Sequence, residues 1–415
     1  MKILHFADAH IDIAAGAGGK QDPVTGLPVR AMDFLSALSS IVDAAINERV
    51  DMVIFAGDAY KDRSPNPTYQ REWGRQIVRL SQAGIPTLLL TGNHDISPSV
   101  ARAHTLQEFS TLKVPNVKVI DRPMLLTPAD LGVPLQVLGL PWISKAGLMT
   151  NMGGESANID EVLSQMEHQL EKLVQKLVER LDPAIPTVLA SHAAVRGAKL
   201  GAERSLSLGA EMTLNLNSLV DDKIDYVALG HIHLAQDLNE GSHPPVIYPG
   251  SIERLNFGEA GDDKFFVIAD VNRGSSTVDW RKINTRPFID KSVTINVETE
   301  DPNSKILKAL GASEKLKDAV VRLTINFPKD MEAQIDEEAI RRHAKEALEF
   351  HLSKRAEAKQ RIRLPDVGIE SMSPAQLLDV YLKNIRADNM EELAQLGAGV
   401  FAEAQSTKEG GQRDG

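Results

Sequence analysis

Short apolar runs alternate with longer amphipathic segments over residues 1–285. The runs have the length of strands and few polar interruptions, which is typical of strands buried on both faces of a parallel sheet. They cover 2–7, 52–56, 87–91, 187–191 and 226–229. Between them, apolar residues recur at helical spacing over 34–46 and 159–181, as in helices that cover a sheet. The pattern therefore predicts an α/β fold for this region.

A group of closely spaced apolar runs follows at 246–248, 265–268 and 277–280. Their alternation and short spacing predict further strands. We expect these strands to extend a second sheet.

Each of the first five strands ends in polar side chains that can bind a metal ion. In chain order these are Asp8 and His10, Asp58 after Gly57, Asn93 to Asp95 after Gly92, His192, and His231 and His233 after Gly230. Ligands of open α/β sheets bind beyond the carboxyl ends of the strands. All five ends can therefore meet at one site. Carboxylate, imidazole and amide ligands without thiolate favour a pair of divalent ions over a structural zinc.

Each of these motifs alone has an ordinary structural explanation. Asp8 and His10 can form a turn, Asp58 can approach a helix N-terminus, and Asn93 tolerates a turn conformation. His192 can be a buried, hydrogen-bonded histidine. Chance would rarely place all five motifs at strand ends in this order, so the combination favours a metal centre.

Composition narrows the possible functions. The chain has 415 residues, no cysteine and a formal net charge of −11. The absence of cysteine excludes disulfides, cysteine nucleophiles and iron–sulfur clusters and fits a cytoplasmic protein. The charge argues against a protein that coats nucleic acid by charge alone, but it leaves a nuclease possible. We expect no signal peptide and no membrane span.

The pattern changes near residue 286. Strands over 292–297, 319–327 and 360–364 and helices over 304–310 and 336–352 predict a small βαβαβ cap domain at 286–365, beside the first domain at 1–285. The C-terminal end of this cap domain is basic, because it contains Lys354, Arg355, Lys359, Arg361 and Arg363. This run is either a solvated face or a contact with a phosphate backbone.

A helical segment is predicted at 366–404, before a disordered tail at 405–415. Ser373 and Pro374 are strong helix-start residues. One face of the helix they begin carries Leu377, Leu378, Tyr381, Leu382 and Ile385, and a second helix is expected over 390–401. This apolar face either packs on its own domain or docks a partner.

The ordered motif set resembles the calcineurin-like metallophosphoesterases over roughly the first 285 residues. Within them the chain is similar to the SbcD-type DNA double-strand-break repair exonucleases, the bacterial counterparts of the meiotic-recombination nuclease. The features shared with this branch are the strand Tyr248 to Ser251, the small appended domain and the helix over 373–382. The resemblance implies a four-layer α/β/β/α sandwich with a cap domain and C-terminal helices.

The resemblance also implies residue roles. Asp8, His10 and His233 would hold one ion, Asn93, His192 and His231 the other, and Asp58 would bridge them. The two ions, which the resemblance implies are Mn²⁺, would activate a water that hydrolyses phosphodiester bonds.

Further roles surround this ligand set. His94 would be catalytic, as acid for the leaving oxygen or as a phosphate contact. Asp95 or Asp62 would orient a histidine. Lys61 stands where archaeal and eukaryotic relatives have a histidine, and it is either a phosphate contact or a surface lysine.

The resemblance implies partners as well. DNA would lie against basic residues that follow the metal motifs, Lys61, Arg63, Arg196, Lys199 and Arg204. An SbcC-type SMC-like coiled-coil ATPase would bind residues 373–401, and the chain would form a homodimer within the complex. Two alternatives stay open. The chain is a phosphoesterase for a cyclic nucleotide, a phosphoprotein or another phosphodiester, or it is a non-catalytic scaffold that binds DNA ends.

Overall fold

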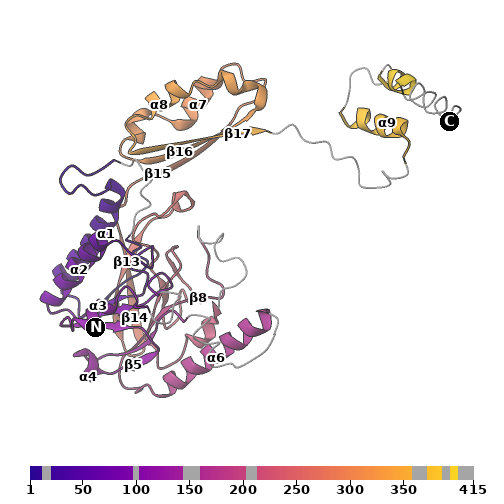
Figure 1. Cartoon of the computed structure of the whole chain (residues 1–415). Coiled ribbons are helices and arrows are strands. Elements are labelled where there is room, and N and C mark those ends of the chain that lie inside the picture. The colour runs from indigo at the N-terminus through magenta and orange to yellow at the C-terminus, as the bar shows by residue number, and fades with distance from the viewer. Residues whose placement is uncertain are drawn as a thin grey trace. The chain divides into compact units, whose positions relative to one another are not determined.

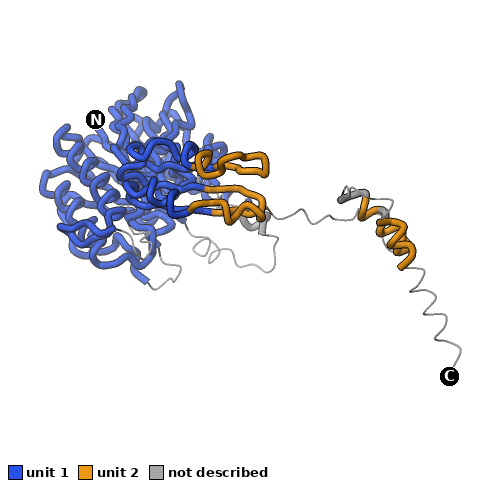
Figure 2. The backbone as a smooth tube through the Cα atoms, turned by 90° about the horizontal axis from the view of Figure 1, so that it is seen from above, with its two compact units in different colours: residues 1–292, 307–323, 337–353 blue, residues 293–306, 324–336, 354–415 orange. Residues whose placement is uncertain are grey.

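The computed structural model describes residues 1–11, 20–96, 102–143, 159–201, 213–357, 372–385 and 393–400. The chain divides into two compact units, which are coloured separately in Figure 2. The first comprises residues 1–292, 307–323 and 337–353, and the second comprises 293–306, 324–336 and 354–415. The predicted boundaries at 285/286, 365/366 and 404/405 stay predictions.

Two six-stranded sheets form the first unit. One has the order β14-β13-β1-β2-β3-β4 and the other the order β11-β12-β10-β7-β6-β5. Strands β1 to β4 are parallel to one another, as are β6, β7, β10 and β12. The strands are β1 Lys2–Phe6, β2 Met52–Phe55, β3 Thr87–Leu90, β4 Val117–Ile120, β5 Met124–Leu126, β6 Gln136–Leu140, β7 Thr187–His192, β10 Tyr226–Gly230, β11 Gln236–Asp237, β12 Val246–Tyr248, β13 Phe265–Asn272 and β14 Ser275–Lys282.

Helices flank these sheets (Figure 1). Apolar residues of α1 and α2 pack with one side of the first sheet, and residues of α6 pack with one side of the second. A further buried cluster contains residues of both sheets, including Ile54 and Ala228. The described helices before residue 285 are α1 Val29–Asn47, α2 Pro67–Gln82, α3 Gln107–Thr111, α4 Pro128–Leu131 and α6 Ile159–Glu179, with the short 3-10 helices η2 Leu216–Ser218 and η3 Phe257–Glu259. The predicted α/β class is confirmed.

The expectation for the strands after residue 246 is only partly right. Strand β12 belongs to the second sheet, but β13 pairs antiparallel with β1 and so places β13 and β14 in the first sheet. The error has a physical cause. Hydrophobic alternation identifies a strand, whereas its partner is set by packing between segments that are far apart in the sequence.

A three-stranded sheet with the order β15-β16-β17 follows. Its elements are β15 Phe288–Thr294, α7 Pro302–Leu310, η4 Ser313–Leu316, β16 Val320–Pro328, η5 Lys329–Gln334, α8 Glu337–His343 and β17 Glu349–Glu357. The predicted helix over 336–352 is wrong in its second half, where β17 begins. The predicted strand over 360–364 lies outside the described residues, as do Lys359, Arg361 and Arg363.

Two short strands, β8 Ala194–Val195 and β9 Thr213–Leu214, pair in parallel after β7. Near the C-terminus, α9 spans Pro374–Ile385, and residues 393–400 are also helical. Within the described ranges, every helix is too short or too polar to cross a lipid bilayer.

His5 ties the two large sheets together at their centre. It lies in β1, is fully buried, and donates from Nε2 to the Leu229 carbonyl of β10 at 3.1 Å. Its Nδ1 then accepts from the Tyr226 hydroxyl at 3.0 Å. Burial lowers the pKa of His5 to about 3, against a weaker opposing effect of the Leu229 hydrogen bond. The imidazole is therefore neutral in the folded chain.

This neutral histidine makes stability depend on pH. The unfolded chain protonates His5 near pH 6.5 and the folded chain only near pH 3, so stability falls as pH drops below 6.5. When the pH falls from 7.5 to 5, protonation of His5 in the unfolded chain should lower the free energy of unfolding by about 2 kcal/mol. Urea unfolding of wild type and His5→Gln at both pH values measures this difference, because all other titrations are shared. Equal pH dependence in the two proteins would contradict the account.

Candidate metal centre

The carboxyl ends of β1 and β2 are held together beyond the strands themselves. Asp8 N–H donates to the Gly57 carbonyl at 3.0 Å, and His10 N–H donates to the Asp58 carbonyl at 3.1 Å. Asp8, His10 and Asp58 have positive φ angles of 51°, 42° and 63°. Residues with side chains adopt such angles at a cost, and they occur often at functional sites. The strain turns these side chains out of the strand direction at one place.

Asp95 fastens the β2 and β3 ends to each other. Its buried carboxylate accepts from the backbone N–H groups of Asp58 at 2.9 Å, Ala59 at 3.1 Å and Gly92 at 2.9 Å. The hydroxyl of Thr105 donates to it at 2.9 Å. Burial, and then the charge of Asp58, raise the pKa of Asp95 to about 6. Asp95 therefore supports the backbone that carries Asp58, and the structure gives it these partners rather than a histidine.

A first group of ligand atoms comes from β1 and β10. Asp8, His10 and His233 each offer one ligand atom, and these atoms lie within 4.8 Å of one another. The Nε2 atoms of His10 and His233 are 3.0 Å apart, and the Asp8 carboxylate accepts from the His231 N–H at 2.9 Å. Burial, and then the neighbouring His233, hold the pKa of His10 well below its usual range. The Nε2 atoms of both imidazoles thus lie at one place beside Asp8.

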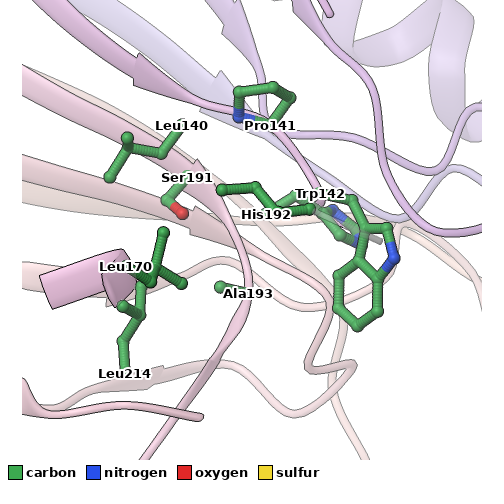
Figure 3. A pocket seen from close by; sticks show the side chains of 9 residues that line it. Leu140, Pro141, Trp142, Leu170, Ser191, His192, Ala193 and Leu214 are labelled. Carbon is green, nitrogen blue, oxygen red and sulfur yellow. The ribbon is translucent and has the colours of Figure 1, made fainter. Parts of the chain in front are cut away.

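A second group comes from β3, β7 and β10. The Asn93 Oδ1 atom lies 3.0 Å from His192 Nε2 and 3.1 Å from His231 Nδ1. Trp142, which the sequence reasoning missed, places its ring 5.2 Å from that of His231 and 6.1 Å from that of His192. Figure 3 shows the indole of Trp142 beside His192.

Asp58 stands between the two groups. Its carboxylate lies with His10 and His94 in one set of ligand atoms within 4.8 Å, and with Asp8 and His192 in another. Burial by itself would raise the pKa of Asp58. The charge and hydrogen bond of His192 instead hold this pKa well below its usual range. Asp58 is therefore an ionised carboxylate within reach of both groups.

The surroundings of His192 fit a cation. Its Nδ1 donates to the Ala56 carbonyl at 2.7 Å, so the lone pair of a neutral ring lies on Nε2. That atom faces Asn93 Oδ1 at 3.0 Å and Asp58 Oδ2 at 3.5 Å. Burial alone would lower the pKa of His192, but Asp58 and then Asp8 raise it to about 9. A proton or a metal ion among these acceptors would offset their negative charge, and metal binding would displace the proton.

His94 is placed differently from the other site residues. Its N–H donates to Asp58 Oδ1 at 2.8 Å, and its ring Nδ1 donates to the Lys61 carbonyl at 2.6 Å. The ring meets that of His10 edge-on at 5.1 Å. Because Nδ1 is engaged, Nε2 is the nitrogen left to face a substrate.

The charged candidates outside the ligand set are exposed wherever the structure describes them. Lys61, Asp62 and Arg63 are exposed, and Arg63 donates to the Asn93 carbonyl at 3.2 Å. Arg196 and Lys199 are also exposed, and Arg196 pairs with Glu167 at 3.3 Å. Arg204 lies outside the described residues.

The pocket in Figure 3 is small and borders His192. It is lined mainly by apolar residues, among them Leu140, Trp142 and Leu170, and its volume is about 20 Å³. That is room for about one water molecule. It is therefore a small void that His192 helps to line.

The sequence alone also did not identify Glu259 and Lys264 as residues of the site. The His233 Nδ1 atom lies 3.1 Å from Glu259 Oε1, and Glu259 Oε2 pairs with the buried ammonium of Lys264 at 2.7 Å. Neither residue ends a strand or belongs to a motif with ligand spacing. The nearby run Tyr248 to Ser251 was the available signal, because the Ser251 hydroxyl accepts from Lys264 at 2.8 Å.

These observations define a phosphoesterase-type site, and comparison with known proteins identifies its family. The chain belongs to the calcineurin-like phosphoesterase family, whose profile matches residues 1–235. The expected family resemblance is confirmed.

Three relatives each share about a quarter of their aligned residues with this chain. The chain is 26% identical over 285 residues to the SbcD subunit of nuclease SbcCD from Escherichia coli K12, covering 66% of each chain. It is 27% identical over 287 residues to the Bacillus subtilis protein of the same name, covering 68% of this chain and 69% of the relative. It is 26% identical over 327 residues to the DNA double-strand break repair protein Mre11 of Archaeoglobus fulgidus, covering 76% and 66%. The matches thus span about two-thirds of each relative.

Solved structures add only distant likenesses. A dimetal phosphatase from Danio rerio has a TM-score of 0.35 at 13% identity, over 67% of this chain and 98% of the other. A hypothetical protein from Thermus thermophilus has a TM-score of 0.33 at 13% identity, over 68% and 100%. Values this low support no conclusion about this chain.

Gly92 is required by close packing against Asp58. A Cβ atom at position 92 would collide with Asp58 Oδ1 and lie 2.6 Å from the Asp58 nitrogen. Gly92→Ala should displace the carboxylate and cost about 1–3 kcal/mol, the usual scale of overpacking. Gly74→Ala is the matched control, because a Cβ there meets nothing within 4 Å and alanine favours the helix. Denaturant unfolding and Mn²⁺ titration compare the two, and equal behaviour would refute the packing argument.

Proposed function

We propose that this chain is a metal-dependent DNA exonuclease and endonuclease, the nuclease subunit of a DNA double-strand-break repair complex. The observation that carries the proposal is the gathering of ligand-type side chains from five strand ends around the ionised carboxylate of Asp58. The relatives named for the SbcCD nuclease and for the DNA double-strand break repair protein Mre11 support DNA as the phosphodiester.

Two divalent ions fit the donors that the chain supplies. Asp8, His10 and His233 would hold one ion, Asn93, His192 and His231 the other, and Asp58 would bridge them. Within the described part of the chain, His10 Nδ1 is buried without a hydrogen-bond partner, which also suits a ring whose position is fixed by a ligand bond. Oxygen and imidazole donors without thiolate suit divalent ions such as Mn²⁺ or Zn²⁺, and the family resemblance favours Mn²⁺. When bound, such ions lower the pKa of water and stabilise charge on phosphate oxygens.

The chain's own residues position the substrate and move a proton. The Lys61 carbonyl accepts from Nδ1 of His94 and fixes its ring. With a second proton on Nε2, the imidazolium can give that proton to the leaving oxygen or donate a hydrogen bond to a phosphate oxygen. Asp95 holds the backbone of Asp58 in place. His94 thus acts on the substrate, whereas Asp95 acts through the residue it supports.

DNA would be held by its backbone. Lys61, Arg63, Arg196, Lys199 and Arg204 follow the metal motifs closely in sequence, and the four that lie in described ranges are exposed. Contacts from such residues to phosphates position a duplex without reading its sequence. Asp62, which is exposed beside them, would limit how closely a phosphate approaches.

The nuclease proposal predicts different effects for two substitutions. Asp58→Ala should abolish two-ion binding and cleavage, because one carboxylate serves both ions. His94→Ser should keep metal and DNA binding but lower turnover by about 10²–10⁴. Both are measured with Mn²⁺ on labelled linear DNA and on bis-p-nitrophenyl phosphate, beside calorimetric metal titration.

Three results would contradict this account. Cleavage above a few per cent in Asp58→Ala refutes the two-ion centre. Loss of metal in His94→Ser makes His94 a ligand. Cleavage of bis-p-nitrophenyl phosphate but never of DNA assigns the site to another phosphodiester.

The C-terminal helices would bind a partner. Tyr381 on α9 is 46% exposed, and Leu396 and Val400 on the following helix are each 63% exposed. Exposed apolar side chains on short helices suit docking into an apolar groove. We assign this surface to an SMC-like coiled-coil ATPase, with two copies of the nuclease in the complex.

Negative charge introduced into this apolar surface should prevent the ATPase from binding. Tyr381→Glu with Leu396→Glu is expected to abolish co-purification and to leave cleavage of small substrates unchanged, because neither residue belongs to the metal centre. Ala375→Glu, at an exposed position of α9, is the matched control and should still co-purify. Complex formation by the double variant would place the partner elsewhere.

A further inference from the structure

Glu259 lies directly behind His233. It is the last residue of the turn η3, is fully buried, and its Oε1 accepts from His233 Nδ1 at 3.1 Å. This contact leaves Nε2 as the nitrogen of His233 that faces the ligand group, 3.0 Å from His10 Nε2. A carboxylate in this position fixes both the tautomer and the orientation of a ligand imidazole.

The second oxygen of Glu259 is held by its own buried network. Oε2 pairs with Lys264 at 2.7 Å and accepts from the Leu255 N–H at 3.2 Å. Lys264 also donates to Ser251 Oγ at 2.8 Å. Buried ion pairs contribute little net stability compared with apolar residues of the same volume. The network therefore calls for a role other than stability.

Phe257, at the other end of the same turn, contacts three strands. Its ring centroid lies 5.3 Å from that of Phe288 in β15 and 5.5 Å from that of His351 in β17. The guanidinium of Arg322 in β16 lies over the same ring at 4.5 Å and pairs with Asp290 of β15. One aromatic side chain thus connects the turn to every strand of the three-stranded sheet.

We propose that Glu259 is a positioning residue for His233 and that Phe257 anchors its turn to strands β15, β16 and β17, so that these strands help to set the geometry of the metal centre. The contacts form one chain from Phe288, Arg322 and His351 through Phe257 to Glu259 and His233. A change in the packing of the strands on Phe257 therefore moves the carboxylate that orients His233. This inference rests on the proposed metal centre.

Removal of Glu259 alone would leave Lys264 buried without its partner and unfold the chain locally, so the test uses a double variant. Glu259→Gln with Lys264→Met removes both charges and keeps an oxygen acceptor for His233. Losing a carboxylate behind a ligand histidine should weaken binding of one of the two Mn²⁺ ions by about 10–100-fold. Calorimetric titration of the full chain measures both dissociation constants.

Variants of Phe257 test the anchoring role more specifically. Phe257→Ala should weaken binding of the same ion. Phe257→Tyr, which keeps the aromatic ring, should bind that ion as tightly as the wild-type chain. Trp280→Ala is the matched control. It removes an aromatic contact with Phe265, 5.8 Å between centroids, on strand β14 and apart from the turn. It should lower the unfolding midpoint without changing either dissociation constant.

The outcomes separate this inference from the nuclease proposal. Wild-type chain that binds no Mn²⁺ refutes the metal centre itself. Wild-type chain that binds two ions, with unchanged constants in the Glu259 and Lys264 double variant, refutes the positioning role. Unchanged constants in Phe257→Ala, or a loss equal to that of Trp280→Ala, refute the anchor. Weakened binding of one ion that Phe257→Tyr restores supports both parts.

Discussion

The geometry of the centre depends on one buried carboxylate, that of Asp58. It stays ionised although it is buried, because the charge and hydrogen bond of the His192 imidazole favour this state. Its backbone is held at positive φ by hydrogen bonds to Asp95, and the absence of a side chain at Gly92 leaves space for it. Moving Asp58 would separate the two groups of ligand atoms that it joins.

Both large sheets supply side chains to the centre around Asp58. Asp8, Asp58 and Asn93 closely follow the ends of β1, β2 and β3, while β7 ends at His192 and His231 follows β10. Such an arrangement needs a fixed register between sheets that are joined mainly by apolar contacts, which are not directional. The buried hydrogen bonds of His5 to Tyr226 and Leu229 are directional contacts between the two sheets. The fold thus places polar contacts where the site needs alignment.

The sequence predicted what is local and missed what depends on distant packing. Strand ends at Asp8, Asp58 and His192 follow from short apolar runs, and the structure gathers these side chains. The helix predicted over 336–352 stops early, because Leu348 N–H bonds the Ala319 carbonyl and Asp318 N–H bonds the Glu346 carbonyl. These long-range bonds override helix propensity. Glu259 and Lys264 were missed for the same reason, since only the folded chain brings them behind His233.

Anomalous diffraction from crystals grown with Mn²⁺ tests the central claim most directly. The account predicts two manganese peaks about 3.5–4 Å apart, the usual spacing of two-ion phosphoryl-transfer sites. The Asp58 carboxylate should lie between them, with His233 on one ion and His192 on the other. A single peak, or two peaks that do not share Asp58, would contradict it.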